Sequence, residues 1–96
     1  MTKIQTKSGF VCNVDENRAR DWRFAKNLAK LDDTSTILQG MAFVVPFLLG
    51  EDGEKALMKH VQDKKGIYPT DKILAEFREI MDLLGAETKK SGSSPE

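Results

Sequence analysis

The segment Thr36–Leu49 constrains the fold more than any other part of the sequence, because its residues are apolar nearly all the way round a helix. A helix without a polar face must occupy the centre of the core or be covered by another chain. The segment is too short for a membrane span, which takes about 20 apolar residues, and Gln39 and Gly40 interrupt it. Its apolar residues are Ile37, Leu38, Met41, Ala42, Phe43, Val44, Val45, Phe47, Leu48 and Leu49.

Pro46 and Gly50 predict the irregular points of this helix. Proline cannot donate a hydrogen bond to the preceding turn, so we expect Pro46 to kink the helix or end its regular part. Gly50 suits the C-cap. Two interpretations of the apolar surplus stay open: a fully buried central helix, or a docking site for a hydrophobic segment of another chain. The candidate partner-binding residues are Phe43, Val44, Phe47 and Leu48.

The first residues, about 2–14, predict a β-hairpin. Thr2–Thr6 and Phe10–Val14 flank a turn that ends at Gly9, and glycine can supply the positive φ of a tight turn. A two-stranded hairpin alone is marginal in water, so one face of it should pack on helices. The side chains expected on that face are Phe10, Cys12 and Val14.

Three further helices are predicted. The first covers Arg18–Leu31, and its apolar positions recur every three or four residues. A short helix follows over about Glu54–Asp63. The last covers about Asp71–Leu84, with Thr70 as N-cap and Gly85 at its end. The inward residues expected in the first of these helices are Ala19, Trp22, Ala25, Leu28 and Ala29.

The 96 residues are enough for one domain, and 40% hydrophobic with 31% charged residues is typical of a folded domain. We therefore expect a mainly α (α+β) fold, in which an N-terminal hairpin precedes about four short helices within residues 1–86. Residues 87–96 contain no residue of the hydrophobic set and predict a disordered polar tail.

Charge and cysteine content favour a cytoplasmic protein without a dedicated nucleic-acid site. The 15 Lys and Arg residues balance the 15 Asp and Glu residues, whereas phosphate binding needs clustered cations. The single cysteine can form no intramolecular disulfide, which is typical of intracellular proteins. The polar opening Thr2–Thr6 does not resemble a secretory signal peptide.

The sequence offers little catalytic chemistry. Cys12 and His60 are the single residues of their types, and a Cys/His nucleophile pair is formally open. Cys12, however, falls on the inward face of a strand, where a free cysteine usually acts as a small hydrophobe. One histidine with scattered carboxylates does not make a zinc site, and the dispersed glycines form no phosphate-binding loop. We expect no enzyme activity, no metal and no cofactor.

One alternative function rests on the basic side of the first helix. Such a side is usually solvated, but it could also serve a small regulatory nucleic-acid-associated protein. A DNA-reading role for the last helix is disfavoured, because that helix carries more anions than cations. The cations of the basic side are Arg18, Arg20, Arg23, Lys26 and Lys30.

The order of short motifs along the chain carries a family resemblance. Thr6–Phe10 opens the hairpin, Asp21-Trp22 lies in an acid-capped helix, and Leu48-Leu49-Gly50 ends the apolar helix. Asp63–Thr70 connects to a last helix that runs into Leu84-Gly85. Over about residues 6–90, this order resembles the small tail assembly chaperones of phages with long, non-contractile tails (siphoviruses) and of their prophages.

The resemblance implies a non-enzymatic helper of phage tail assembly. Members of that family bind the hydrophobic tape measure protein, keep it soluble and recruit tail tube subunits around it. They act in the host cytoplasm and are absent from the mature virion. The resemblance therefore implies two protein partners, no nucleic acid, no membrane and no cofactor. Whether the chain also associates with itself stays open.

Overall fold

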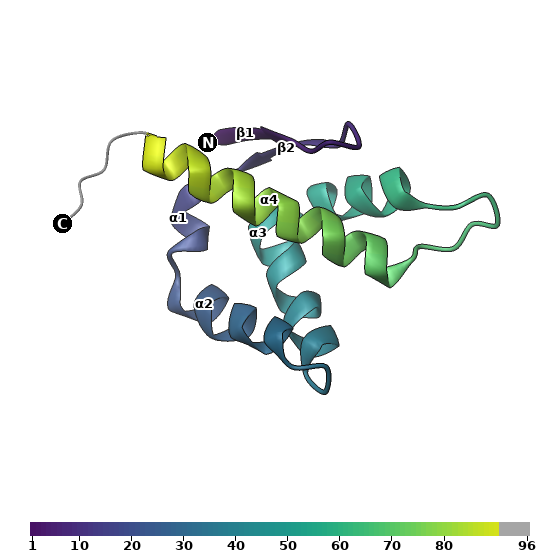
Figure 1. Cartoon of the computed structure of the whole chain (residues 1–96), viewed down its shortest axis with the longest axis horizontal. Coiled ribbons are helices and arrows are strands. Elements are labelled where there is room, and N and C mark those ends of the chain that lie inside the picture. The colour runs from purple at the N-terminus through teal and green to yellow at the C-terminus, as the bar shows by residue number, and fades with distance from the viewer. Residues whose placement is uncertain (91–96) are drawn as a thin grey trace.

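The computed structural model describes residues 1–90, and their side chains up to residue 85. An antiparallel hairpin precedes a set of helices in which α4 crosses the molecule, with the hairpin along one side of it and α2 on the other (Figure 1). The predicted mainly α fold with an N-terminal hairpin is thus confirmed. The elements are β1 (Thr2–Gln5), β2 (Val11–Val14), α1 (Glu16–Ala19), α2 (Trp22–Leu28), the 3-10 helix η1 (Ala29–Asp32), α3 (Ile37–Val61) and α4 (Thr70–Lys90).

The hairpin forms as predicted. Ile4 pairs with Cys12 in an antiparallel register, and Gly9 in the turn has φ of 96°. The amide of Thr6 donates to the carbonyl of Phe10 (2.9 Å) and closes the turn. Phe10, Cys12 and Val14 are buried, so the predicted inward face of the hairpin is confirmed.

The prediction of one continuous helix over Arg18–Leu31 is wrong, because three short helices, α1, α2 and η1, occupy this region. Asp21 has an extended backbone, and its carboxylate accepts a hydrogen bond from the amide of Arg23 (2.8 Å), so it restarts the helix as an N-cap. The restart rotates the following side chains. Phe24 becomes buried (1% exposed), whereas Trp22 is 73% exposed. Ala25 and Ala29 are exposed as well, so the prediction that these residues and Trp22 face the core is also wrong.

Helix α3 bends at Gly50 and not at Pro46. The backbone of Pro46 stays helical, whereas Gly50 has φ 79° and ψ 167°, a combination open essentially to glycine alone. The predicted kink at Pro46 is therefore wrong. The bend at Gly50 divides α3 into an apolar first half and a more polar second half, which matches the predicted division into two helices.

Helix α4 is longer than predicted. It begins at Thr70, the residue expected as its N-cap and one residue before the expected start at Asp71. The carbonyl of Pro69 accepts hydrogen bonds from the amides of Lys72 (3.2 Å) and Ile73 (3.1 Å). Gly85 does not take a positive φ, and the helix continues through it to Lys90, helped by the good helix formers that follow. The predicted end at Leu84 is wrong, and the remainder of the predicted tail, residues 91–96, lies outside the described residues.

The core lies between the hairpin, α3 and α4, with α2 closing one side. Phe77 at its centre is fully buried, and its ring lies 6.4 Å from that of Phe24. None of the helices among the described residues has the length and apolar character to cross a membrane. The buried side chains of the core are Ile4, Phe10, Cys12, Val14, Phe24, Leu31, Met41, Val44, Val45, Leu48, Leu57, Val61, Phe77, Ile80 and Leu84.

Candidate binding surfaces

The structure separates the four partner-binding residues predicted on α3. Val44 is 0% exposed and Leu48 is 2% exposed, so neither can belong to a docking edge of the free domain. Their assignment to an exposed edge is corrected, because both lie on the stripe of α3 that faces the core. Phe43 and Phe47 are half-buried, and their rings stack with centroids 5.1 Å apart at 22°.

Two arginines contact one ring of this pair, that of Phe47. The guanidinium carbons of Arg18 and Arg23 lie 5.5 Å and 5.2 Å from the centroid of Phe47, within the range of cation–π attraction. Arg18 also donates from Nη1 to the carbonyl oxygen of Phe47 (3.0 Å). The structure thus brings together the apolar edge of α3 and the basic side of the first helices. We call Phe43, Phe47, Arg18 and Arg23 the Phe47 edge.

A carboxylate lies inside this basic surface. Arg23 donates from Nε and Nη2 to the two carboxylate oxygens of Asp21, at 3.0 Å and 2.8 Å. These hydrogen bonds, with the one from the amide of Arg23, lower the pKa of Asp21 from 3.8 to about 2. Asp21 is therefore charged at neutral pH, and it offsets part of the positive charge that a phosphate would meet.

The opposite edge of α3 forms an apolar groove that the sequence analysis missed. Leu38 is 63% exposed at its margin, and Glu54 is the charged residue among those that line it. The groove has a volume of about 260 Å³. It needs the bend at Gly50, which sets the second half of α3 at an angle to the first. We call it the Leu38 groove, and it is lined by Leu38, Met41, Ala42, Val45, Glu54, Leu57, Met58, Thr70 and Ile73.

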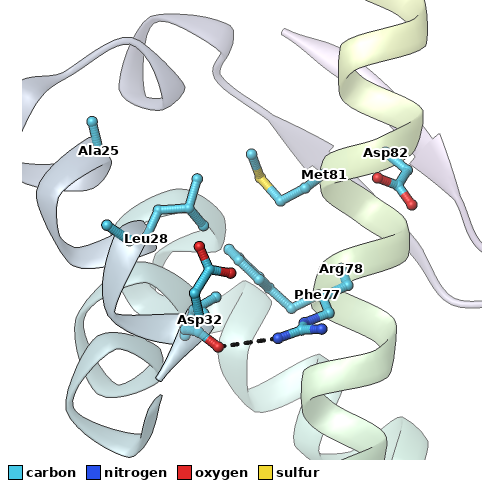
Figure 2. Close-up of a pocket in the computed structure, with 9 residues that line it drawn as sticks. Ala25, Leu28, Asp32, Phe77, Arg78, Met81 and Asp82 are labelled. Atoms are coloured by element: carbon cyan, nitrogen blue, oxygen red, sulfur yellow. Dashed lines mark hydrogen bonds between the residues drawn. The ribbon is translucent and has the colours of Figure 1, made fainter. Parts of the chain in front are cut away.

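A larger cavity of about 630 Å³ lies between α2 with η1 and α4 (Figure 2). Leu28 and Met81 point toward each other across it, and Phe77 lies below them. The guanidinium of Arg78 donates to the carbonyl oxygen of Leu31 (3.1 Å), which joins α4 to η1. This α2–α4 cavity is lined by Ala25, Leu28, Ala29, Leu31, Asp32, Phe77, Arg78, Met81 and Asp82.

Ser8, His60 and Glu76 meet where the hairpin turn reaches the helices. Ser8 Oγ lies 2.9 Å from His60 Nε2 and donates to Glu76 Oε2 (2.7 Å). In a Ser–His–Asp triad the carboxylate holds the imidazole, whereas Glu76 here holds the serine. The amide of Lys7 donates to the neighbouring Glu79 on α4 (2.7 Å). The arrangement therefore anchors the turn to α3 and α4 and lacks the order of contacts that activates a nucleophile.

The other predicted chemical residue, Cys12, lies in the core, and burial raises the pKa of its thiol. A raised pKa lowers the fraction of reactive thiolate, so Cys12 behaves as a small hydrophobe. Within the described part of the chain, no group of three or more His, Cys, Asp or Glu residues could hold a metal ion. Comparisons with protein-family profiles, curated proteins and solved structures gave no match to this chain.

Proposed function

We propose that this protein is a phage or prophage tail assembly chaperone that binds a hydrophobic helical segment of the tape measure protein and recruits tail tube subunits. It does so without catalysis, in the host cytoplasm, and does not remain in the mature virion. The observation that carries the proposal is the Leu38 groove, an apolar channel that the bend of α3 leaves uncovered. The partners come from the family resemblance, and we propose the groove as the binding site of the first of them, the tape measure protein.

The groove suits an amphipathic helix. Helix-in-groove recognition uses apolar anchors spaced three and four residues apart, which lie along a channel between two elements. The two halves of α3 and the start of α4 form such a channel. Met41 and Met58 line it, and flexible methionine side chains adapt to partners whose sequences differ. A chaperone that binds several segments of one long protein needs this adaptability.

The Phe47 edge is less suited to an apolar segment. An aliphatic partner on Phe47 would have to displace or desolvate Arg18 and Arg23, and burying an unpaired charge is costly. The nucleic-acid alternative is also disfavoured on this surface, because Asp21 would lie beside any bound phosphate. We therefore assign the tape measure segment to the Leu38 groove. A substitution at Phe43 then tests the Phe47 edge as the alternative site.

The test places one charge on each surface. Leu38→Asp changes an exposed side chain, so the domain should fold normally by circular dichroism but lose co-purification with the tape measure protein. Ile67→Asp is the matched control, because Ile67 is 58% exposed and does not line the groove. Phe43→Asp tests the Phe47 edge.

A folded Leu38→Asp variant that still keeps the tape measure protein soluble would contradict the groove as the site. Loss of binding in Phe43→Asp alone would move the site to the Phe47 edge. If the unchanged chain fails to keep the tape measure protein soluble in co-expression, the proposed function itself is wrong.

A further inference from the structure

Glu54 is the one charged side chain among the residues that line the Leu38 groove. It is half-buried there, and its neighbours in the lining are apolar except for Thr70. Among residues 1–85, no cation pairs with the Glu54 carboxylate, and no side chain or amide donates a hydrogen bond to it. In the free domain this carboxylate therefore depends on solvent for its hydrogen bonds.

A helix that fills the groove would exclude this solvent from Glu54. Burying a carboxylate without a partner is costly, and part of that cost would be subtracted from the affinity gained by apolar contact. A lysine or arginine on the bound helix would offset the cost with a charge-assisted hydrogen bond. An acidic side chain in the same place would add like-charge repulsion to it.

The rim of the groove beside Glu54 is also negative. Glu51 precedes Glu54 by one helical turn, so it lies on the same face of α3, and it is exposed. Within the part of the chain that has described side chains, Glu51 has no ion pair either. Lys55 follows Glu54 directly, but it is exposed and does not line the groove. The second half of α3 therefore presents a negative edge, which is complementary to a basic segment.

We propose that the Leu38 groove selects helical segments that carry lysine or arginine beside their apolar stripe, with Glu54 as the residue that determines this selectivity. The inference rests on the proposed function, because it takes the groove as the site of the tape measure segment. Apolar contact with the groove gives the affinity, and the charge beside the stripe decides which amphipathic segments bind. Acidic segments with the same apolar stripe are rejected.

Synthetic amphipathic peptides of about 18 residues, or five helical turns, test the selectivity. Three peptides share one stripe of leucines and differ in the residues beside it, which are lysine, glutamine or glutamate. Fluorescence anisotropy of the labelled peptides measures their Kd for the unchanged chain in about 0.15 M salt, where charges more than about 8 Å apart are largely screened. We expect the lysine peptide to bind at least about tenfold more tightly than the glutamate peptide, with the glutamine peptide between them.

Two variants with the same net charge assign this preference to one side chain. Glu54→Gln removes the charge and keeps the shape of the side chain. Asp52→Asn is the matched control, because Asp52 is exposed on the same half of α3 and does not line the groove. Glu54→Gln should reduce the ratio of the Kd values of the glutamate and lysine peptides at least about fivefold, whereas Asp52→Asn should change it less than about twofold. Both variants should fold normally by circular dichroism.

The selectivity is contradicted if the lysine and glutamate peptides bind equally, if the glutamate peptide binds more tightly, or if the two variants change the ratio to the same extent. In these cases, binding of the glutamine peptide that Leu38→Asp abolishes would leave the groove, and with it the proposed function, intact. If none of the three peptides binds, the groove is not a helix site and the selectivity is wrong with it. Co-expression with the tape measure protein then still decides the proposed function.

Discussion

The replacement of Gly40 by alanine probes the closest approach between two helices of this domain. Gly40 lies in the first half of α3, where α2 and η1 cross it. A Cβ built at this position would lie 2.6 Å from the carbonyl oxygen of Asn27, 3.0 Å from Cβ of Lys30 and 3.1 Å from Cδ2 of Leu31. The nearest atom belongs to the backbone, so no side-chain rotation relieves the contact and the two helices must move apart.

Two opposing contributions, helix propensity and overpacking, decide how much Gly40→Ala changes the free energy of unfolding. Alanine is about 1 kcal/mol better than glycine in a helix interior, whereas overpacking a core usually costs about 1–3 kcal/mol. Because the shortest contact is with backbone, we take the upper end of the overpacking cost and expect a net loss of about 2 kcal/mol in the free energy of unfolding. For a domain of this size, that loss corresponds to a decrease in Tm of about 8–16 °C.

Gly85→Ala is the matched control for urea or thermal unfolding followed by circular dichroism. Gly85 also lies inside a helix, but a Cβ there would meet no atom within 4 Å. This variant should therefore gain about 0.5–1 kcal/mol from helix propensity alone. The two substitutions are chemically the same, and we expect them to change the free energy of unfolding in opposite directions. A Gly40→Ala variant as stable as the unchanged chain would show that α2 and η1 do not approach α3 in this way.

Three further predictions concern stability. Phe77→Ala should lower the free energy of unfolding by about 3–5 kcal/mol in urea titration, because the ring is fully buried; a loss below about 1 kcal/mol would remove Phe77 from the core. Gly50→Ala should cost at least about 1–3 kcal/mol, because its φ of 79° strains a residue with a Cβ, and an unchanged Tm would argue against the bend. The pKa of Asp21 is lower in the folded chain than its usual 3.8, so on acidification the unfolded chain takes up the proton first. The stabilisation of the folded chain by the charged Asp21 is therefore present above about pH 5 and is lost as the pH falls toward 2. Asp21→Asn should remove this part of the acid dependence, and an unchanged profile of stability between pH 2 and 5 would contradict it.

The sequence was sufficient to predict the elements whose signals are local. The alternation of Phe10, Cys12 and Val14 around a turn glycine specifies the hairpin, and its packing on helices follows from its marginal stability. The apolar spacing around Phe77 likewise specifies the inward face of α4. These predictions needed no knowledge of distant contacts.

The errors arose where two local signals competed. Trp22 fits the apolar spacing of a continuous helix, but Asp21 also fits an N-cap, and the carboxylate–amide hydrogen bond restarts the helix. Pro46 removes one hydrogen bond and is tolerated in a helix that the core holds on its other side, whereas the backbone of Gly50 leaves the helical region altogether. Neither outcome follows from propensities alone, because tertiary packing decides between the signals.

None of the four residues predicted as partner-binding lines the Leu38 groove. Phe43 and Phe47 were identified as surplus apolar residues, and both are half-buried at an edge of α3. The Leu38 groove could not be predicted, because it joins residues of the two halves of α3 and the start of α4, and the angle at Gly50 sets their positions. The exposed fraction of Leu38 is a property of the fold and has no signal in the sequence.

The most direct test of the proposed function is a methyl NMR titration. The chain has four methionines: Met41 and Met58 line the Leu38 groove, Met81 lines the α2–α4 cavity, and Met1 lines neither. With ¹³C-methyl methionine at a fixed chain concentration, addition of a hydrophobic helical segment of the tape measure protein should shift or broaden the signals of Met41 and Met58 and leave those of Met1 and Met81 unchanged. Unchanged signals for Met41 and Met58 at saturating segment would contradict the Leu38 groove as its binding site.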